Sequence, residues 1–178
     1  MKMEPSAEEF DGEDRKSLFP ADYSVCAVCA LLETPEEKYI LQLRDNTEGI
    51  WFPDTWGLFG GLIGKTESPQ EALCRELKEE LELDINPKAP VYFTQFAVDA
   101  RGIDMGLTLR LIYRIPVTRD QIEAMVLHEG AAFRDFTPAE LVSGKYPLVP
   151  TDLMALHMYF MGQGIVPSPD PEFPDYQS

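Results

Sequence analysis

The sequence is poor in positive charge, in cysteine and in long apolar runs. Fifteen lysines and arginines stand against 31 aspartates and glutamates, which gives a formal net charge of −16 at pH 7. Proteins that bind the phosphate backbone of DNA or RNA need a basic surface. The charge balance therefore argues against a nucleic-acid polymer as partner. A small ligand that carries phosphate would need cations to neutralise it locally.

No apolar stretch has the length of a membrane span, and the acidic N-terminus lacks the apolar core of a signal peptide. We therefore expect a cytoplasmic protein with no membrane partner. Three cysteines, an odd number, do not make a disulfide framework. Cys26 and Cys29 form a C-x-x-C, a spacing used by zinc and redox sites, but they lie in the apolar run YSVCAVCALL. Residues three apart on a strand point to opposite faces, so we interpret both as buried structural thiols.

At 178 residues the chain has the length of one domain with a full core. We divide it into a polar N-terminal leader (1–20), a folded domain (21–164) and a proline-rich, acidic tail (165–178). Apolar and alternating runs predict strands at 23–32, 38–43, 91–98, 107–115 and 131–136, with a glycine-rich strand or bulged loop at 56–63. Helical patterns cover 72–83 and 151–160, with a capped helical turn at 137–141 and a short helical or loop segment at 118–125. This order favours an α/β fold in which a mixed sheet lies between helices, an α/β/α sandwich.

The helix at 72–83 has clear start signals. Ser68 is a suitable N-cap, Pro69 is tolerated in the first turn, and Glu71 completes a capping box. The residues that follow are rich in helix formers and contain neither proline nor glycine. Leu73 and Leu77, with neighbouring apolar residues, form a stripe that would press on a core.

Three glutamates on this helix, Glu76, Glu79 and Glu80, lie three and four residues apart, so we expect their carboxylates to converge. Like charges repel one another unless a cation lies among them, and hard divalent cations prefer oxygen ligands. Arg75 lies four residues before Glu79 and is well placed to orient it. A solvated acidic face with ordinary Arg–Glu pairing is the alternative, and for an isolated R-E-x-x-E-E it would be the simpler interpretation.

The longer segment from Gly61 to Leu83 resembles the box of the Nudix hydrolase family, G-x5-E-x7-R-E-U-x-E-E-x-G-U, in which U is aliphatic. The matching positions are Gly61, Glu67, Arg75, Glu76, Leu77, Glu79, Glu80 and Leu83. The single departure is Glu82, where the family has glycine. A left-handed helix cap suits glycine and costs a residue with a Cβ about 1 kcal/mol. The departure therefore concerns the end of the helix and none of the charged positions.

The resemblance implies the Nudix α/β/α sandwich and a metal-dependent hydrolase that cleaves the diphosphate linkage of a nucleoside diphosphate derivative. It implies a metal site for Mg²⁺, or Mn²⁺, whose ligands by position are Glu76, Glu79, Glu80 and the carbonyl of Gly60. Arg75 would orient the ligand carboxylates, and Glu67 would support them. The general base would be a box glutamate or Glu129, which lies in the loop before the last strand. A plain surface acid is the alternative for Glu129.

Substrate recognition is less sharply indicated. Arg44, after the second strand, is a candidate phosphate contact, with a surface ion pair as the alternative. Trp51 and Trp56 are candidates for stacking on a base, although at least one aromatic residue of this loop should belong to the core. We expect a small-molecule nucleotide partner and lean towards nucleoside diphosphate sugars. The alternatives that remain open are nucleoside triphosphates, including oxidised ones, and dinucleoside polyphosphates as substrates. A non-catalytic nucleotide-sensing module and a homodimer also remain open.

Overall fold

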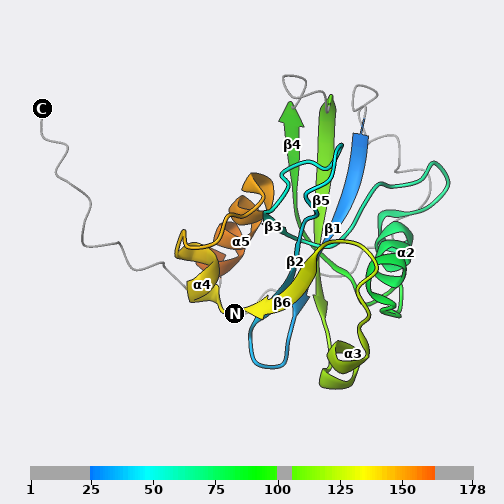
Figure 1. The fold of residues 1–178 in the computed structure, drawn as a ribbon. Helices are drawn as coiled ribbons and strands as arrows, with labels where there is room; N and C mark the ends of the chain where they lie inside the picture. Colours follow the sequence, from blue (N-terminus) through cyan, green and yellow to red (C-terminus); the bar gives the residue numbers. More distant parts are fainter. Residues whose placement is uncertain (1–24, 100–105, 163–178) are drawn as a thin grey trace, which may run out of the picture.

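Six strands of the protein pair into one mixed sheet (Figure 1). The computed structural model describes residues 25–99 and 106–162. The strands are β1 (Val25–Glu33), β2 (Tyr39–Leu43), β3 (Trp56–Gly57), β4 (Val91–Asp99), β5 (Leu107–Pro116) and β6 (Ala132–Phe136). The helices are α2 (Pro69–Leu81), α3 (Arg119–Ala124), α4 (Pro138–Val142) and α5 (Pro150–Gly162). The order of elements predicted from the sequence is confirmed.

The sheet runs in the order β3-β2-β1-β5-β4, and β6 pairs with β2. β1 and β5 are parallel, and the other pairs are antiparallel. α2 covers one face of this sheet, and α4 and α5 lie on the other (Figure 1). Val28 and Leu32 of β1 pack on the side of α2, whereas Cys29 and Leu31 pack on the side of α5. The structure is therefore the predicted α/β/α sandwich, with a core on each side of the sheet.

The two cysteines of the C-x-x-C motif lie on opposite faces of β1, as predicted. Cys26 is half-buried against the core on the side of α2, and Cys29 is buried in the core on the side of α5. Burial raises the pKa of the Cys29 thiol to about 11, so the group stays protonated at neutral pH. This arrangement is that of structural thiols and cannot direct both sulfur atoms at one metal ion.

The glycine-rich segment 56–63 begins as the short strand β3 and continues as an irregular stretch that bridges to β1. Trp56 and Gly57 pair with β2, after which single bridges join Phe59 to Ala30 and Leu62 to Ala27. Phe59 is fully buried in the core on the side of α2. The segment thus runs beside β1 and brings the start of the box to the centre of the sheet.

A buried ion pair fixes the start of α5 to the sheet. The Asp152 carboxylate accepts from Arg110 Nη2 at 2.6 Å and from the amide of Leu58 at 2.9 Å. Arg110 Nη2 also lies 3.0 Å from Cys29 Sγ. Asp152 is 1% exposed, and removal of one partner from such a pair leaves an uncompensated buried charge. This pair secures the α5 layer and was not predicted from the sequence.

α2 starts with the predicted capping box between Ser68 and Glu71 and ends at Leu81, two residues before the predicted end at Leu83. The leader (1–20) and the tail (165–178) proposed from the sequence lie outside the described residues. Across the described ranges, no helix combines the length and apolarity needed to cross a membrane.

Candidate active site

Two glycines let the loop at the start of the box approach β1 and α2 closely. Gly60 has φ +130°, and a Cβ there would collide with the carbonyl oxygen of Val28. A Cβ on Gly61, the first residue of the box, would collide with the carboxyl group of Glu76. Gly60 therefore requires glycine, whereas a side chain at Gly61 would displace the Glu76 carboxylate from its place.

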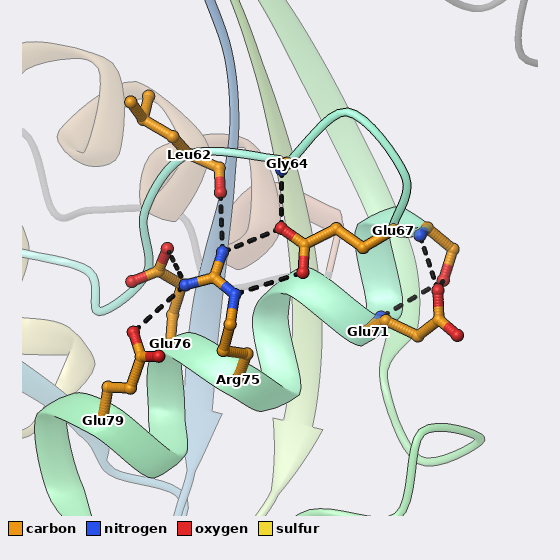
Figure 2. Close-up of polar contacts among 8 residues, drawn as sticks. Leu62, Gly64, Glu67, Glu71, Arg75, Glu76 and Glu79 are labelled. Carbon is orange, nitrogen blue, oxygen red and sulfur yellow. Dashed lines mark hydrogen bonds and ion pairs between the residues drawn. The ribbon is translucent and has the colours of Figure 1, made fainter.

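Arg75 is the centre of a hydrogen-bonded network on α2 (Figure 2). Its Nε and Nη2 donate to the two carboxylate oxygens of Glu67, at 3.1 and 2.8 Å. Nη2 also donates to the Leu62 carbonyl at 3.0 Å. Nη1 donates to Glu76 at 2.8 Å and to Glu79 at 3.1 Å. The planar guanidinium thus holds the loop and two box carboxylates in a fixed relation, which one lysine could not do.

Glu80 is a buried acid beside the loop. Glu80 is only 4% exposed, and its Oε2 accepts a hydrogen bond from the amide of Gly60 at 3.0 Å. The pKa of Glu80 is raised to about 8, chiefly by burial, and the negative charges of Glu129 and Glu76 contribute to the rise. The Gly60 amide and the charge of Arg44 act in the opposite direction. Glu80 therefore lies in buried surroundings with too little positive charge to favour its ionised form.

The three box glutamates have different hydrogen-bond partners. Glu76 and Glu79 both bind Arg75, whereas Glu80 binds the backbone of Gly60. Within residues 25–99 and 106–162, no three His, Cys, Asp or Glu side chains are grouped as a metal cage. Arg75 and the Gly60 amide thus supply separate donors to carboxylates that repel one another.

The oxygen donors nevertheless fit a hard divalent cation. Burial raises the pKa of Glu76 as well, and Glu79 and Glu129 add to this effect while Arg75 opposes it. Like-charge repulsion among Glu76, Glu80 and Glu129 is the condition that a bound cation relieves. Carboxylate and carbonyl oxygens are also the ligands that Mg²⁺ and Mn²⁺ prefer.

Glu129 lies at the same site although it is far from the box in sequence. It lines a small pocket with Arg44 and Asp45. The neighbouring amide of Gly130 donates to Asp45 at 3.0 Å, and that of Ala131 to the Leu43 carbonyl at 2.8 Å. The structure thus brings together the loop acid, Arg44 and the buried end of the box.

The structure separates the two tryptophans proposed for substrate binding. Arg44 Nε donates to the carbonyl of Trp51 at 2.6 Å, which places the half-buried Trp51 next to the Arg44 guanidinium. Trp56 instead packs edge-on against Phe136, with ring centroids 4.8 Å apart, and Arg134 lies over its ring. Trp56 is therefore the aromatic residue with a packing role in the core on the side of α5.

One contact at the end of α2 was missed at the sequence level. Glu82, the departure from the box, has φ 55° and caps the helix through its amide, which donates to the carbonyls of Leu77 and Lys78. Its carboxylate lies 2.7 Å from Nε2 of His128. The departure from glycine at the end of the box marked Glu82 as unusual in the sequence. No local pattern could have indicated that its partner is His128, 46 residues away.

A sequence model of the NUDIX domain matches residues 24–154. No curated protein gives a significant match. Similar solved structures include a MutT protein from Methanosarcina mazei Go1, with TM-score 0.66 and 17% identity over 80% of this chain and 97% of that one. The NUDIX domain of Shewanella oneidensis NrtR, complexed with ADP ribose, has TM-score 0.62 and 20% identity over 86% and 94%.

A bifunctional NMN adenylyltransferase/ADP ribose pyrophosphatase from Francisella tularensis, complexed with AMP and a Mn ion, has TM-score 0.61 and 14% identity. The match covers 85% of this chain and 45% of that chain. The TM-scores show a common fold. The domain match covers most of the chain, including every position of the box. The chain therefore belongs to the Nudix family, and its enzyme class is that of the Nudix pyrophosphohydrolases.

Proposed function

We propose that the protein is a divalent-metal-dependent pyrophosphohydrolase that hydrolyses the diphosphate linkage of nucleoside diphosphate derivatives. The observation that carries this proposal is the contrast between two parts of the box. Arg75 fixes Glu76 and Glu79, while the neighbouring Glu80 is buried and accepts a hydrogen bond from the uncharged Gly60 amide. A buried acid surrounded by other acids is costly unless it binds a cation, so we assign it a functional role.

Glu76, Glu79, Glu80 and the backbone of Gly60 would hold Mg²⁺ or Mn²⁺. A bound divalent cation would neutralise diphosphate oxygens and lower the pKa of a water molecule. The part of Arg75 is to hold two of these carboxylates in place, and that of Glu67 is to fix Arg75 through a two-point contact.

Glu129 is our candidate for the general base, which would take a proton from the attacking water. Its charge raises the pKa of both Glu76 and Glu80, so it lies near the carboxylates of the box. Arg44 lines the same small pocket and offers guanidinium donors to a phosphate group. Trp51, whose carbonyl accepts a hydrogen bond from Arg44, lies in the loop between β2 and β3 and would contact the nucleotide from that loop.

We place nucleoside diphosphate sugars first among substrates. Two proteins of similar structure support this order, since one is described as an ADP ribose pyrophosphatase and another as a domain complexed with ADP ribose. Nucleoside triphosphates, including oxidised ones, are the second class. A module that binds nucleotide without turnover is the alternative function, but all charged positions of the box are present, which favours catalysis.

A substrate panel with Mg²⁺ or Mn²⁺ tests the proposal. It should contain ADP-ribose, UDP-glucose, GTP, 8-oxo-dGTP and a dinucleoside polyphosphate, with products separated by chromatography. A sugar substrate yields a nucleoside monophosphate and a sugar phosphate, whereas a triphosphate yields a monophosphate and pyrophosphate. Glu37→Gln, in the turn between β1 and β2, is the matched control for Glu80→Gln. Nucleotide binding without hydrolysis in either metal would contradict the proposal and favour the sensing module.

A further inference from the structure

The loop of residues 126–130, which we call the Glu129 loop, is attached at its start to the end of the box helix. The amide of Val126 donates to the carbonyl of Leu81 at 3.0 Å, and the amide of His128 donates to that of Glu80 at 2.8 Å. The last carbonyls of a helix have no partner within the helix. The Glu129 loop supplies partners for two of them, so the two elements are joined through their backbones.

The other end of the Glu129 loop is attached to the end of β2. Gly130 has φ +91°, and a Cβ there would lie 2.9 Å from Gln42 Oε1 and 3.0 Å from the carbonyl oxygen of Leu43. Its amide donates to Asp45. Glu129 therefore lies between two anchors, with α2 before it and β2 after it, and its position depends on both.

The anchor on the side of α2 includes one contact between side chains, from Glu82 to His128. With a proton on Nε2, the imidazole donates to the Glu82 carboxylate across 2.7 Å, and the pair carries opposite charges when the ring is protonated. Glu82 adopts a backbone conformation that glycine accepts at lower cost. The backbone of Glu82 makes the helix cap, so capping does not explain why a residue with a side chain occupies this strained position.

We propose that Glu82 is a positioning residue, which holds the Glu129 loop against the end of the box helix through His128 and so keeps Glu129 at the site. The inference rests on the role proposed for Glu129 in catalysis. It explains why the chain carries glutamate where glycine would give a more stable cap. Both side chains are about half exposed, so the pair biases the position of the loop and does not lock it.

Replacement of Glu82 by glycine separates positioning from stability. Glu82→Gly removes the strain of the left-handed cap, so its melting temperature should equal or exceed that of the parent protein. Its kcat should fall roughly 3- to 5-fold, with little change in KM, which is the range available from one half-exposed pair. Amide hydrogen exchange of residues 126–130 should rise by a similar factor. Glu82→Gln keeps an acceptor for His128 and should stay within about twofold of the parent in both measurements.

Asp84→Asn is the matched control. Asp84 binds Lys78 at 2.7 Å in another exposed pair at the end of the same helix, and this pair does not involve the Glu129 loop. The control should change neither kcat nor the exchange of the loop. Equal loss of kcat in Glu82→Gly and Asp84→Asn would overturn the inference, because it would indicate a general effect of surface charge.

The two readouts distinguish this inference from the proposed function. If Glu82→Gly leaves the exchange of residues 126–130 unchanged, Glu82 does not position the loop, whatever the activity. If exchange rises but Glu129→Gln hydrolyses substrate at the parental rate, the positioning role holds and the assignment of Glu129 as base is wrong. In the Glu129→Gln background, Glu82→Gly should have no further effect on kcat, since both changes act through one group.

Discussion

Glu80 combines burial, unfavourable charge and a proposed role as a metal ligand. An ionised carboxylate in a desolvated pocket is unfavourable, and the nearby acids Glu76 and Glu129 make it more so. The same features suit a metal ligand, because a divalent cation supplies the positive charge that the protein does not. Glu80→Gln keeps the volume and an oxygen for the Gly60 amide, so it removes charge with little change of packing.

Glu80→Gln should reduce turnover about 10²-fold or more at saturating substrate. The lost carboxylate weakens both cation binding and the electrostatic stabilisation of the departing phosphate. Steady-state kinetics over a range of Mg²⁺ concentrations measure this, with Glu37→Gln as control. Parental turnover in Glu80→Gln would show that this face of α2 does not bind the catalytic metal.

Without metal, the difference in stability between the parent protein and Glu80→Gln should depend on pH, because only the parent carries the titrating carboxyl group. The pKa of Glu80 is raised to about 8 in the folded protein, against roughly 4.3 in an unfolded chain. Between these values the folded state retains a proton that the unfolded state has lost, so the free energy of unfolding falls as pH rises. In EDTA at pH 8.5, Glu80→Gln should melt a few degrees above the parent protein, and the gap should narrow near pH 5. A melting temperature far below the parent at both pH values would contradict this account of Glu80.

At the scale of elements, α2 serves both the core and the site. One face presents Leu73, Leu77 and Leu81, all fully buried against the sheet, and the other carries Arg75 and the box acids. The start of this helix could be predicted from the sequence because its capping box is local. Its end could not be placed as well, since Glu82 adopts a conformation that the sequence alone disfavours.

Leu77→Ala should lower the free energy of unfolding by about 2–5 kcal/mol, because Leu77 is fully buried and the surrounding core cannot fill the space. Chemical denaturation in EDTA measures the loss without a contribution from metal. Lys78→Ala, on the exposed side of the same helix, should change stability by less than about 0.5 kcal/mol. If the two variants unfolded at the same denaturant concentration, the assignment of the buried face would be wrong.

The neighbours of each element were less predictable than the elements themselves. β1 pairs with β5, which follows much later in the chain, and the apolar pattern of a strand does not specify its partner. For the site, the resemblance to the Nudix box supplied the positions of Arg75 and the glutamates. It could not supply the contact of Glu82 with His128 or the pair of Arg110 with Asp152, because both join segments that only the fold brings together.

Across the described structure, the sheet separates the acids of the box from the buried Cys29 thiol. The box and its acids lie on the side of α2, and the buried thiol of Cys29 lies on the side of α5 beside Arg110. A zinc site built from Cys26 and Cys29 would need both thiols on one face. We therefore expect native protein to contain no stoichiometric zinc, and the folded double variant Cys26→Ala/Cys29→Ala to retain activity. Elemental analysis that found one zinc per chain would overturn this interpretation.

The central claim, that a protein with a net charge of −16 hydrolyses a phosphate anhydride by means of a divalent cation at the box, is tested most directly by removal and return of the metal. Protein dialysed against EDTA should hydrolyse its best substrate from the nucleotide panel at the background rate. Excess Mg²⁺ or Mn²⁺ should restore the rate along a saturable curve, and Glu80→Gln should require more metal or remain slow. Full turnover by the thoroughly chelated parent protein would contradict the claim.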